Sequence, residues 1–357
     1  MTTIKNGNKM IYIELLRILA AIAVIMIHVT AVLIRNNEVA TLSWNISMVI
    51  NSLTRWCIPL FFMISGCCFL NRERKFSVRE IIKKYVLRLT VVLIIFGLFY
   101  YFFDLWIYNQ TIDLKRILLA PFNVLSGHTG YHLWYLYDMI LIYLMIPILQ
   151  NFIQHAGKKL LEYAMIVFVV FELFVTYFNS LINYVPVLAD VLKINFEFPD
   201  LIGYIGCFVG GYYISHYEIS KRIKNLVYVL GVVGLLIMPL GNWILSKIQG
   251  IYISVFSDYN GLFSVMLAVT LLVLLKSKEE HIKESKFAGW IVNLGRSTFG
   301  IYLVHVIIVS IVFHKLPIDL LKYNSIVTIV ALTIFVFIVS YILVYVIKKI
   351  SISKKYI

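Results

Sequence analysis

Apolar stretches long enough to cross a lipid bilayer recur along this chain, with short polar loops between them. A spanning helix needs roughly 20 predominantly apolar residues. Only 14% of the 357 residues are charged, whereas soluble domains average about 25%. We therefore expect an all-α integral membrane protein in which residues 1–357 form a single polytopic domain. About ten spans are expected, at about 11–34, 46–70, 85–108, 133–153, 160–180, 200–216, 225–247, 259–276, 290–313 and 324–347.

The formal net charge of +14 is concentrated in alternate loops. This placement argues against nucleic acid as a partner and favours the anionic headgroups of membrane lipids. Because basic loops mark the cytoplasmic side of a membrane, both termini are expected to be cytoplasmic. The basic loops contain Arg72, Arg74, Lys75, Arg79, Lys83 and Lys84; Lys158 and Lys159; Lys221, Arg222 and Lys224; and Lys276, Lys278, Lys283 and Lys286.

The first expected span carries three ionisable residues, Glu14, Arg17 and His28. A charge in mid-bilayer costs roughly 3 kcal/mol or more, so each such residue is a candidate functional residue. The eleven residues from Arg17 to His28 turn through about 1100°, which is close to three full turns. Arg17 and His28 therefore share one helical face, about 16 Å apart along the axis. Glu14 is placed to pair with Arg17.

Other polar side chains lie in or beside the expected spans. Arg55 is followed by Pro59, which should loosen the helix just beyond the arginine. Further candidates are His132, Trp134 and Asp138 near the fourth span, and Ser297, Tyr302 and His305 in the ninth, with His305 at a depth similar to that of His28. For any one of these residues the alternative is a packed, hydrogen-bonded helix contact without a chemical role. Four cysteines lie inside apolar stretches and offer neither a disulfide framework nor metal-ligand spacing, so no metal site is expected.

The amphipathic segment 112–131 precedes the fourth span. We expect it to form an interfacial or re-entrant segment.

Four sequence blocks resemble the membrane acyltransferase-3 family, whose members O-acylate bacterial surface polysaccharides and related glycans. They are ELLR at 14–17 with His28, RWCIPLFFMISG at 55–66, HLWYL at 132–136 with Pro147, and LGRSTFGIYLVH at 294–305. The blocks occur in the family's order and extend over most of the chain. One position departs from the family pattern, since Tyr85 stands where a second arginine often accompanies Arg88.

The resemblance implies transfer of an acyl group, with acetyl favoured, from cytoplasmic acyl-CoA to a hydroxyl of an extracytoplasmic or lipid-linked glycan. It implies a multi-pass protein of the bacterial cytoplasmic membrane, with acyl-CoA as a co-substrate and no permanently bound cofactor. His28 is then the expected general base, supported by Glu14, Arg17 and Arg55. Basic residues expected to hold the phosphates of the donor are Arg72, Arg74, Lys84 and Arg88. Residues expected to support the acceptor are His132, Trp134, Asp138, Ser297, Tyr302 and His305.

Two other classes of function stay open from the sequence. Buried charges within about ten spans also suit a secondary transporter, although no pair of similarly interrupted helices is seen in the two halves. A membrane sensory or substrate-binding module of the same fold is the second alternative.

Overall fold

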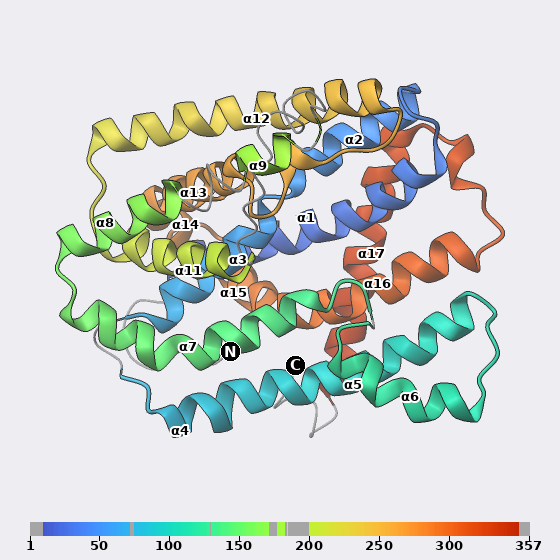
Figure 1. Cartoon of the computed structure of the whole chain (residues 1–357), viewed down its shortest axis with the longest axis horizontal. Coiled ribbons are helices and arrows are strands. Elements are labelled where there is room, and N and C mark those ends of the chain that lie inside the picture. Colours follow the sequence, from blue (N-terminus) through green and yellow to red (C-terminus); the bar gives the residue numbers. More distant parts are fainter. Residues whose placement is uncertain are drawn as a thin grey trace. The chain divides into compact units, whose positions relative to one another are not determined.

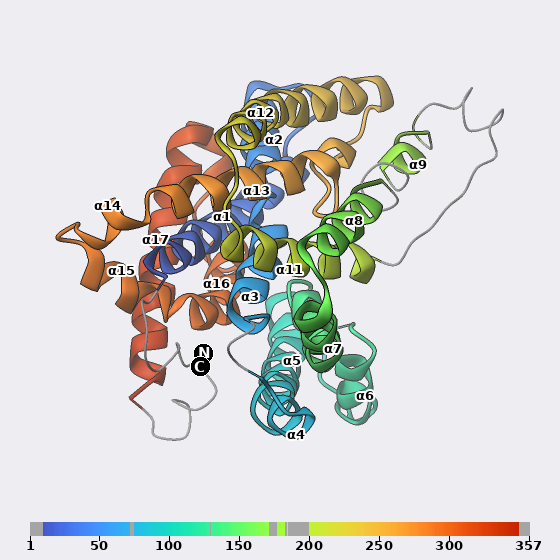
Figure 2. The same ribbon diagram turned by 90° about the vertical axis from the view of Figure 1, so that its left-hand side faces the viewer.

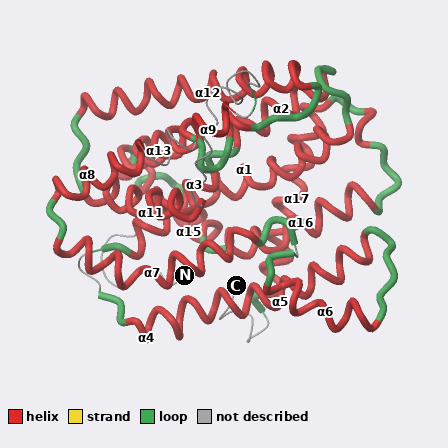
Figure 3. Tube along the Cα trace, in the orientation of Figure 1, coloured by secondary structure: helices red, strands yellow, loops and turns green. Residues whose placement is uncertain are grey.

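The structure, a computed structural model, describes residues 10–71, 75–128, 130–170, 177–182, 184 and 200–349. Over these residues the chain is helical, without β-strands (Figures 1 and 3). The first half contains α1 (Ile11–Asn36), α2 (Leu42–Thr54), α3 (Cys57–Phe69), α4 (Val78–Glu80), the π-helix η1 (Ile81–Val86), α5 (Leu87–Ile107), α6 (Leu114–Leu125), α7 (Trp134–His155), α8 (Lys158–Phe168) and α9 (Tyr177–Ile182). The second half contains α11 (Asp200–His216), α12 (Lys221–Gln249), η3 (Val255–Ser257), α13 (Leu262–Ser277), α14 (Glu279–Lys283), α15 (Ala288–Gly295), α16 (Thr298–His314), η4 (Leu320–Lys322) and α17 (Ser325–Ile347).

Within the described ranges, seven helices are long and apolar enough to cross a membrane, or eight if α15 and α16 form one broken span. The expectation of an all-α, multi-pass membrane protein is confirmed, while the count of ten and the side of the termini stay predictions. Of the two other expected spans, 160–180 begins with α8 but includes residues 171–176, which lie outside the described residues. The other corresponds to α11, which has only 17 residues.

The chain divides into two compact units. The first contains residues up to Asn71, Ala156–Thr298 and Leu321–Ile334. In it, α1 packs against α2, α3 and α15, and α12 packs against α2 and α13 (Figure 2). The second contains Arg72–His155, Phe299–Leu320 and Phe335–Ile357, with α5 packed against α6 and α7.

Small residues bring α3 and α11 together in the first unit. A Cβ added at Gly66 would overlap the backbone carbonyl of Phe208, and one added at Gly211 would overlap that of Met63. The Cys67 thiol also donates to the carbonyl oxygen of Gly211 at 3.1 Å. Because lipid offers no hydrophobic drive to bring helices together, such close backbone approach is a main source of helix association in membranes.

The helix break expected near Pro59 is present. α2 ends at Thr54 and α3 begins at Cys57, with Arg55 and Trp56 between them. Pro59 has no N–H to donate to the carbonyl oxygen of Arg55, so the regular helical ladder is interrupted there.

The expected span 290–313 stays a prediction. The structure has two helices there with a 62° bend between them, because α15 ends at Gly295 and α16 begins at Thr298. The break is stabilised by local hydrogen bonds. The Thr298 hydroxyl donates to the carbonyl oxygen of Gly295 at 2.7 Å, and the Ser297 amide donates to that of Leu294 at 2.9 Å. Side chains of this kind compete with the helical hydrogen bonds of the backbone.

The segment 112–131 contains α6, a separate helix whose large apolar residues are exposed. Leu114, Leu118, Phe122 and Leu125 are each more than 60% exposed. Asp113 caps the helix by accepting from the Arg116 amide at 2.8 Å. Its location at the membrane interface stays a prediction.

Two neighbouring glycines of α11 test the packing of α3. Gly211→Ala is expected to lower the free energy of unfolding by about 3 kcal/mol, because the new methyl group overlaps a backbone carbonyl that moves only if α3 moves. Gly210→Ala is the matched control, since nothing lies within 4 Å of its added Cβ. Thermal unfolding in detergent measures both changes. Equal stability of the two variants would contradict the close approach of α3 and α11.

Candidate functional site

The residues predicted from the sequence divide between the two units. Glu14, Arg17, His28, Arg55 and Ser297 lie in the first unit. The second unit contains Lys84, Arg88, His132, Trp134, Asp138, Tyr302 and His305. Arg72 and Arg74 lie outside the described residues.

Glu14 and Arg17 form a buried ion pair on α1. Arg17 Nη1 lies 2.9 Å from Glu14 Oε1, and the two residues are only 8% and 3% exposed. Arg17 Nη2 also contacts the Cys68 Sγ at 3.5 Å. The pairing expected from their spacing of three residues is therefore confirmed. The contact of Arg17 with Cys68 connects α1 to the end of α3.

The N-terminal end of α1 is closely packed against α15. A Cβ added at Gly295 would overlap the Glu14 carboxylate. The glycine therefore allows α15 to approach the buried charge at a distance that a larger residue would prevent.

A second polar arrangement connects α1, α2 and the loop before α13. We call it the Asn51 network, and it consists of Thr30, Asn51, Arg55 and Tyr252. The Asn51 amide nitrogen donates to the carbonyl oxygen of Ile27 at 3.1 Å and to Thr30 Oγ1 at 2.9 Å. Asn51 Oδ1 accepts from Arg55 Nε at 3.0 Å and from the Tyr252 hydroxyl at 2.9 Å.

The Asn51 network connects Arg55 to the turn of α1 that carries His28. Asn51 is bound to the α1 carbonyl of Ile27, the residue directly before His28. The Arg55 guanidinium also lies over the Tyr259 ring, 4.9 Å from its centroid. Arg55 is thereby held on one side by an amide and on the other by an aromatic face. His28 itself is only partly buried.

A further set of buried polar side chains connects α2, η3 and α12. Asn242 donates to the hydroxyl of Ser52 at 2.9 Å and to that of Ser257 at 2.7 Å, and its oxygen accepts from the Phe256 amide at 2.9 Å. All three side chains, Ser52, Asn242 and Ser257, are fully buried. Their mutual hydrogen bonds satisfy groups that would otherwise be costly to bury.

Sequence reasoning missed Asn51, Thr30 and Tyr252. Asn51 lies four residues before Arg55 on the same helix face, and that spacing was an available signal. No local pattern marks Tyr252, because it joins the network from a loop about two hundred residues further along the chain.

In the second unit, three separate segments form a cluster that we call the histidine cluster, consisting of Tyr100, His132, Tyr302 and His305. The rings of His132 and His305 meet edge to face with centroids 5.5 Å apart, and Tyr100 meets His132 at 4.6 Å. The Tyr302 hydroxyl donates to the carbonyl oxygen of His132 at 2.6 Å. The Tyr100 hydroxyl donates to the carbonyl oxygen of Leu303 at 2.8 Å. The structure thus brings together three residues that the sequence predicted on distant segments.

The other predicted residues of the second unit are less enclosed. Arg88 is partly buried and lies over the Phe299 ring at 5.8 Å. Lys84 is exposed and lies 3.7 Å from Glu80. Trp134 and Asp138 are partly buried on the first two turns of α7.

The Glu14–Arg17 pair makes a stability prediction. Arg17→Met leaves a buried carboxylate without its cation and is expected to cost about 3–5 kcal/mol. Glu14→Gln in addition removes that charge, so the double variant is expected to be more stable than Arg17→Met alone. Thermal unfolding of the two single variants and the double variant measures the coupling. Additive losses would contradict the buried pair.

No curated protein and no solved structure matches the chain. A family model described as "Acyltransferase domain" matches residues 10–345, which is nearly the whole chain and includes every described residue of both polar clusters. The chain therefore belongs to this acyltransferase family.

Proposed function

We propose that the protein transfers an acyl group, with acetyl favoured, from cytoplasmic acyl-CoA to a hydroxyl of an extracytoplasmic or lipid-linked glycan. The family supports a membrane acyltransferase. The observation that carries the assignment to particular residues is the Asn51 network, which ties Arg55 to α1 at the residue before His28. A bacterial cytoplasmic membrane is the proposed location.

His28 is the proposed general base. Imidazole exchanges protons near neutral pH, so it suits removal of a hydroxyl proton. As the acceptor oxygen attacks the thioester carbonyl, its proton passes to His28. Collapse of the tetrahedral intermediate breaks the carbon–sulfur bond, and the thiol of CoA leaves with that proton. The Glu14–Arg17 pair lies near the other end of the same helix, where Arg17 also contacts Cys68 of α3.

Arg55 is the proposed stabiliser of the negative charge that develops on the carbonyl oxygen. A donor that is already oriented stabilises such a charge without having to reorganise during the reaction. Asn51 and Tyr259 provide this orientation for Arg55. Asn51 is therefore a positioning residue in this proposal.

Donor and acceptor are assigned to different groups. Arg88 and Lys84, with Arg72 and Arg74, are proposed to bind the phosphates of CoA, because arginine matches phosphate geometry through paired hydrogen bonds. The histidine cluster, with Trp134, Asp138 and Ser297, is proposed to support the acceptor sugar.

The role of His28 is tested by deleting the gene in its host and restoring it on a plasmid. The gene is restored as wild type, His28→Ala or His155→Ala, and esters on purified surface glycans are measured by NMR and mass spectrometry. His28→Ala is expected to reduce the restored ester by about 10²–10⁴-fold, the usual contribution of general base catalysis. His155→Ala is the control because this histidine is exposed at the end of α7. Glycan esters that are the same in all strains would contradict glycan acylation.

The positioning role of Asn51 is tested by a mutant cycle with Arg55. Asn51→Leu removes all four hydrogen bonds and is expected to lower transfer at least about tenfold, because Arg55 is misplaced. In an Arg55→Gln background the same change should have little further effect. Tyr252→Phe removes one of the four bonds and should lose less activity. Equal losses from Asn51→Leu in both backgrounds would show that Asn51 does not act through Arg55.

A further inference from the structure

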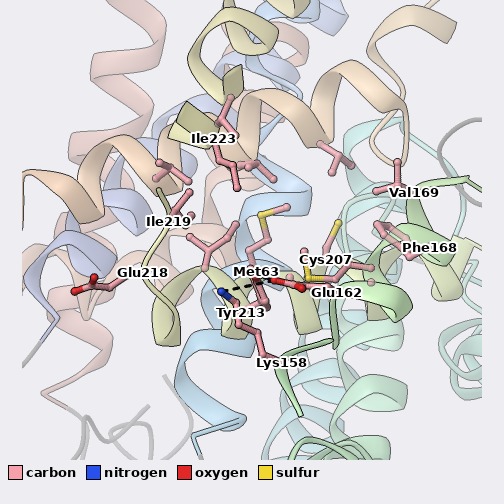
Figure 4. A pocket seen from close by; sticks show the side chains of 18 of the residues that line it. Met63, Lys158, Glu162, Phe168, Val169, Cys207, Tyr213, Glu218, Ile219 and Ile223 are labelled. Carbon is pink, nitrogen blue, oxygen red and sulfur yellow. Dashed lines mark hydrogen bonds and ion pairs between the residues drawn. The ribbon is translucent and has the colours of Figure 1, made fainter. Parts of the chain in front are cut away.

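A cavity of about 290 Å³ lies in the first unit between α3, α8, α11, α12 and α13, and none of the candidate site residues lines it (Figure 4). Its body is lined by aliphatic side chains from the interior turns of these helices. They include Met63, Met165, Val227, Val265, Val269 and Val273. Pockets for drug-sized ligands usually measure about 300–1,000 Å³. At about 290 Å³ this cavity lies just below that range, and its apolar lining suits part of an alkyl chain better than a glycan.

One end of the cavity is polar. Lys158 begins α8, and Glu218 and Ser220 lie between α11 and α12. The Tyr213 hydroxyl donates to Glu162 Oε1 at 2.6 Å, and Lys158 Nζ lies 3.7 Å from the same oxygen (Figure 4). A polar end at the helix termini and an apolar body between the helices fit an amphipathic ligand that lies along the helix axes.

The charges around this end favour an anion. Lys158 lines it, and four more basic residues directly follow or flank lining residues in the sequence, namely Lys159, Lys221, Arg222 and Lys224. Two acidic residues, Glu162 and Glu218, line it, and the Lys158–Glu162 pair balances one charge of each sign, so the positive excess comes from the basic residues beside Lys158 and at the start of α12. Clusters of lysine and arginine at a membrane surface attract anionic lipid headgroups.

We propose that this cavity binds an anionic phospholipid. One acyl chain fills the apolar body, and the phosphate is held by Lys158 and the basic residues at the start of α12. A lipid is the natural occupant because the surrounding helices are apolar on their outer faces, with Val229, Val232 and Leu236 of α12 each more than half exposed. This inference does not depend on the proposed acyl transfer.

Gly210 offers a way to fill the cavity without disturbing its walls. It lines the cavity, and nothing lies within 4 Å of a Cβ added there. Gly210→Leu therefore places an alkyl side chain where the lipid chain would lie. Gly289→Leu is the matched control, because Gly289 also has open space around an added Cβ but is exposed on α15.

The test uses the intact protein in phosphatidylcholine vesicles that contain a trace of photoreactive phosphatidylglycerol with a diazirine on one acyl chain. Phosphatidylcholine with the same chain is the comparison probe. After illumination, mass spectrometry locates the labelled peptides. Phosphatidylglycerol is expected to label the peptides containing Met165, Cys207 and Val269 about fivefold more than phosphatidylcholine does, the factor expected from one basic residue near an anionic group.

The variants separate the acyl-chain site from the headgroup site. Gly210→Leu should reduce labelling of the cavity peptides by both probes, whereas Gly289→Leu should leave it unchanged. Lys158→Gln should reduce the preference for phosphatidylglycerol while chain labelling continues. Cavity labelling that Gly210→Leu does not reduce would overturn the site. Equal labelling by the two probes in the wild type would overturn the anionic headgroup.

Discussion

A charged side chain inside a spanning helix needs a partner, because hydrocarbon cannot replace the water that it has lost. Arg17 finds its partner in Glu14 on the same helix. Arg55 finds it in Asn51, whose amide also binds the backbone of α1. The two arginines therefore take part in the contacts that join α1 to α3 and α2. The lack of a side chain at Gly295 lets α15 lie against the Glu14 carboxylate.

The same contacts hold the part of α1 that carries His28. His28 lies on a helix that is joined to α3 by the Arg17–Cys68 contact near one end and to α2 by Asn51 next to the histidine. Catalytic groups have to be held rigidly by the residues behind them, and hydrogen-bonded side chains on helices meet that requirement better than loops do. A packed helix contact explains the burial of Glu14 and Arg17 equally well. The Asn51 amide in addition connects Arg55 to the turn of α1 that carries His28.

The sequence predicted those features that depend on local spacing. The Glu14–Arg17 pair follows from three residues on one helix, and the break after Arg55 follows from Pro59. The broken helix at Ser297 was missed because its stabilising hydrogen bonds from Thr298 are local but not distinctive. The only sequence signal for Asn51 is its spacing of four residues from Arg55. No sequence signal marks Tyr252, since only tertiary packing brings this residue to α2. The lipid cavity was beyond sequence reasoning because five helices contribute to its walls.

His28 is proposed to act as the general base when an acceptor hydroxyl on the other side of the membrane takes the acyl group from a cytoplasmic donor. This role is tested most directly in oriented membrane vesicles supplied on their cytoplasmic face with acetyl-CoA radiolabelled in its acetyl group. The account predicts base-labile label on glycan at the opposite face with the wild-type protein, and none above background with His28→Ala. Label that reaches the glycan equally with both proteins would contradict it.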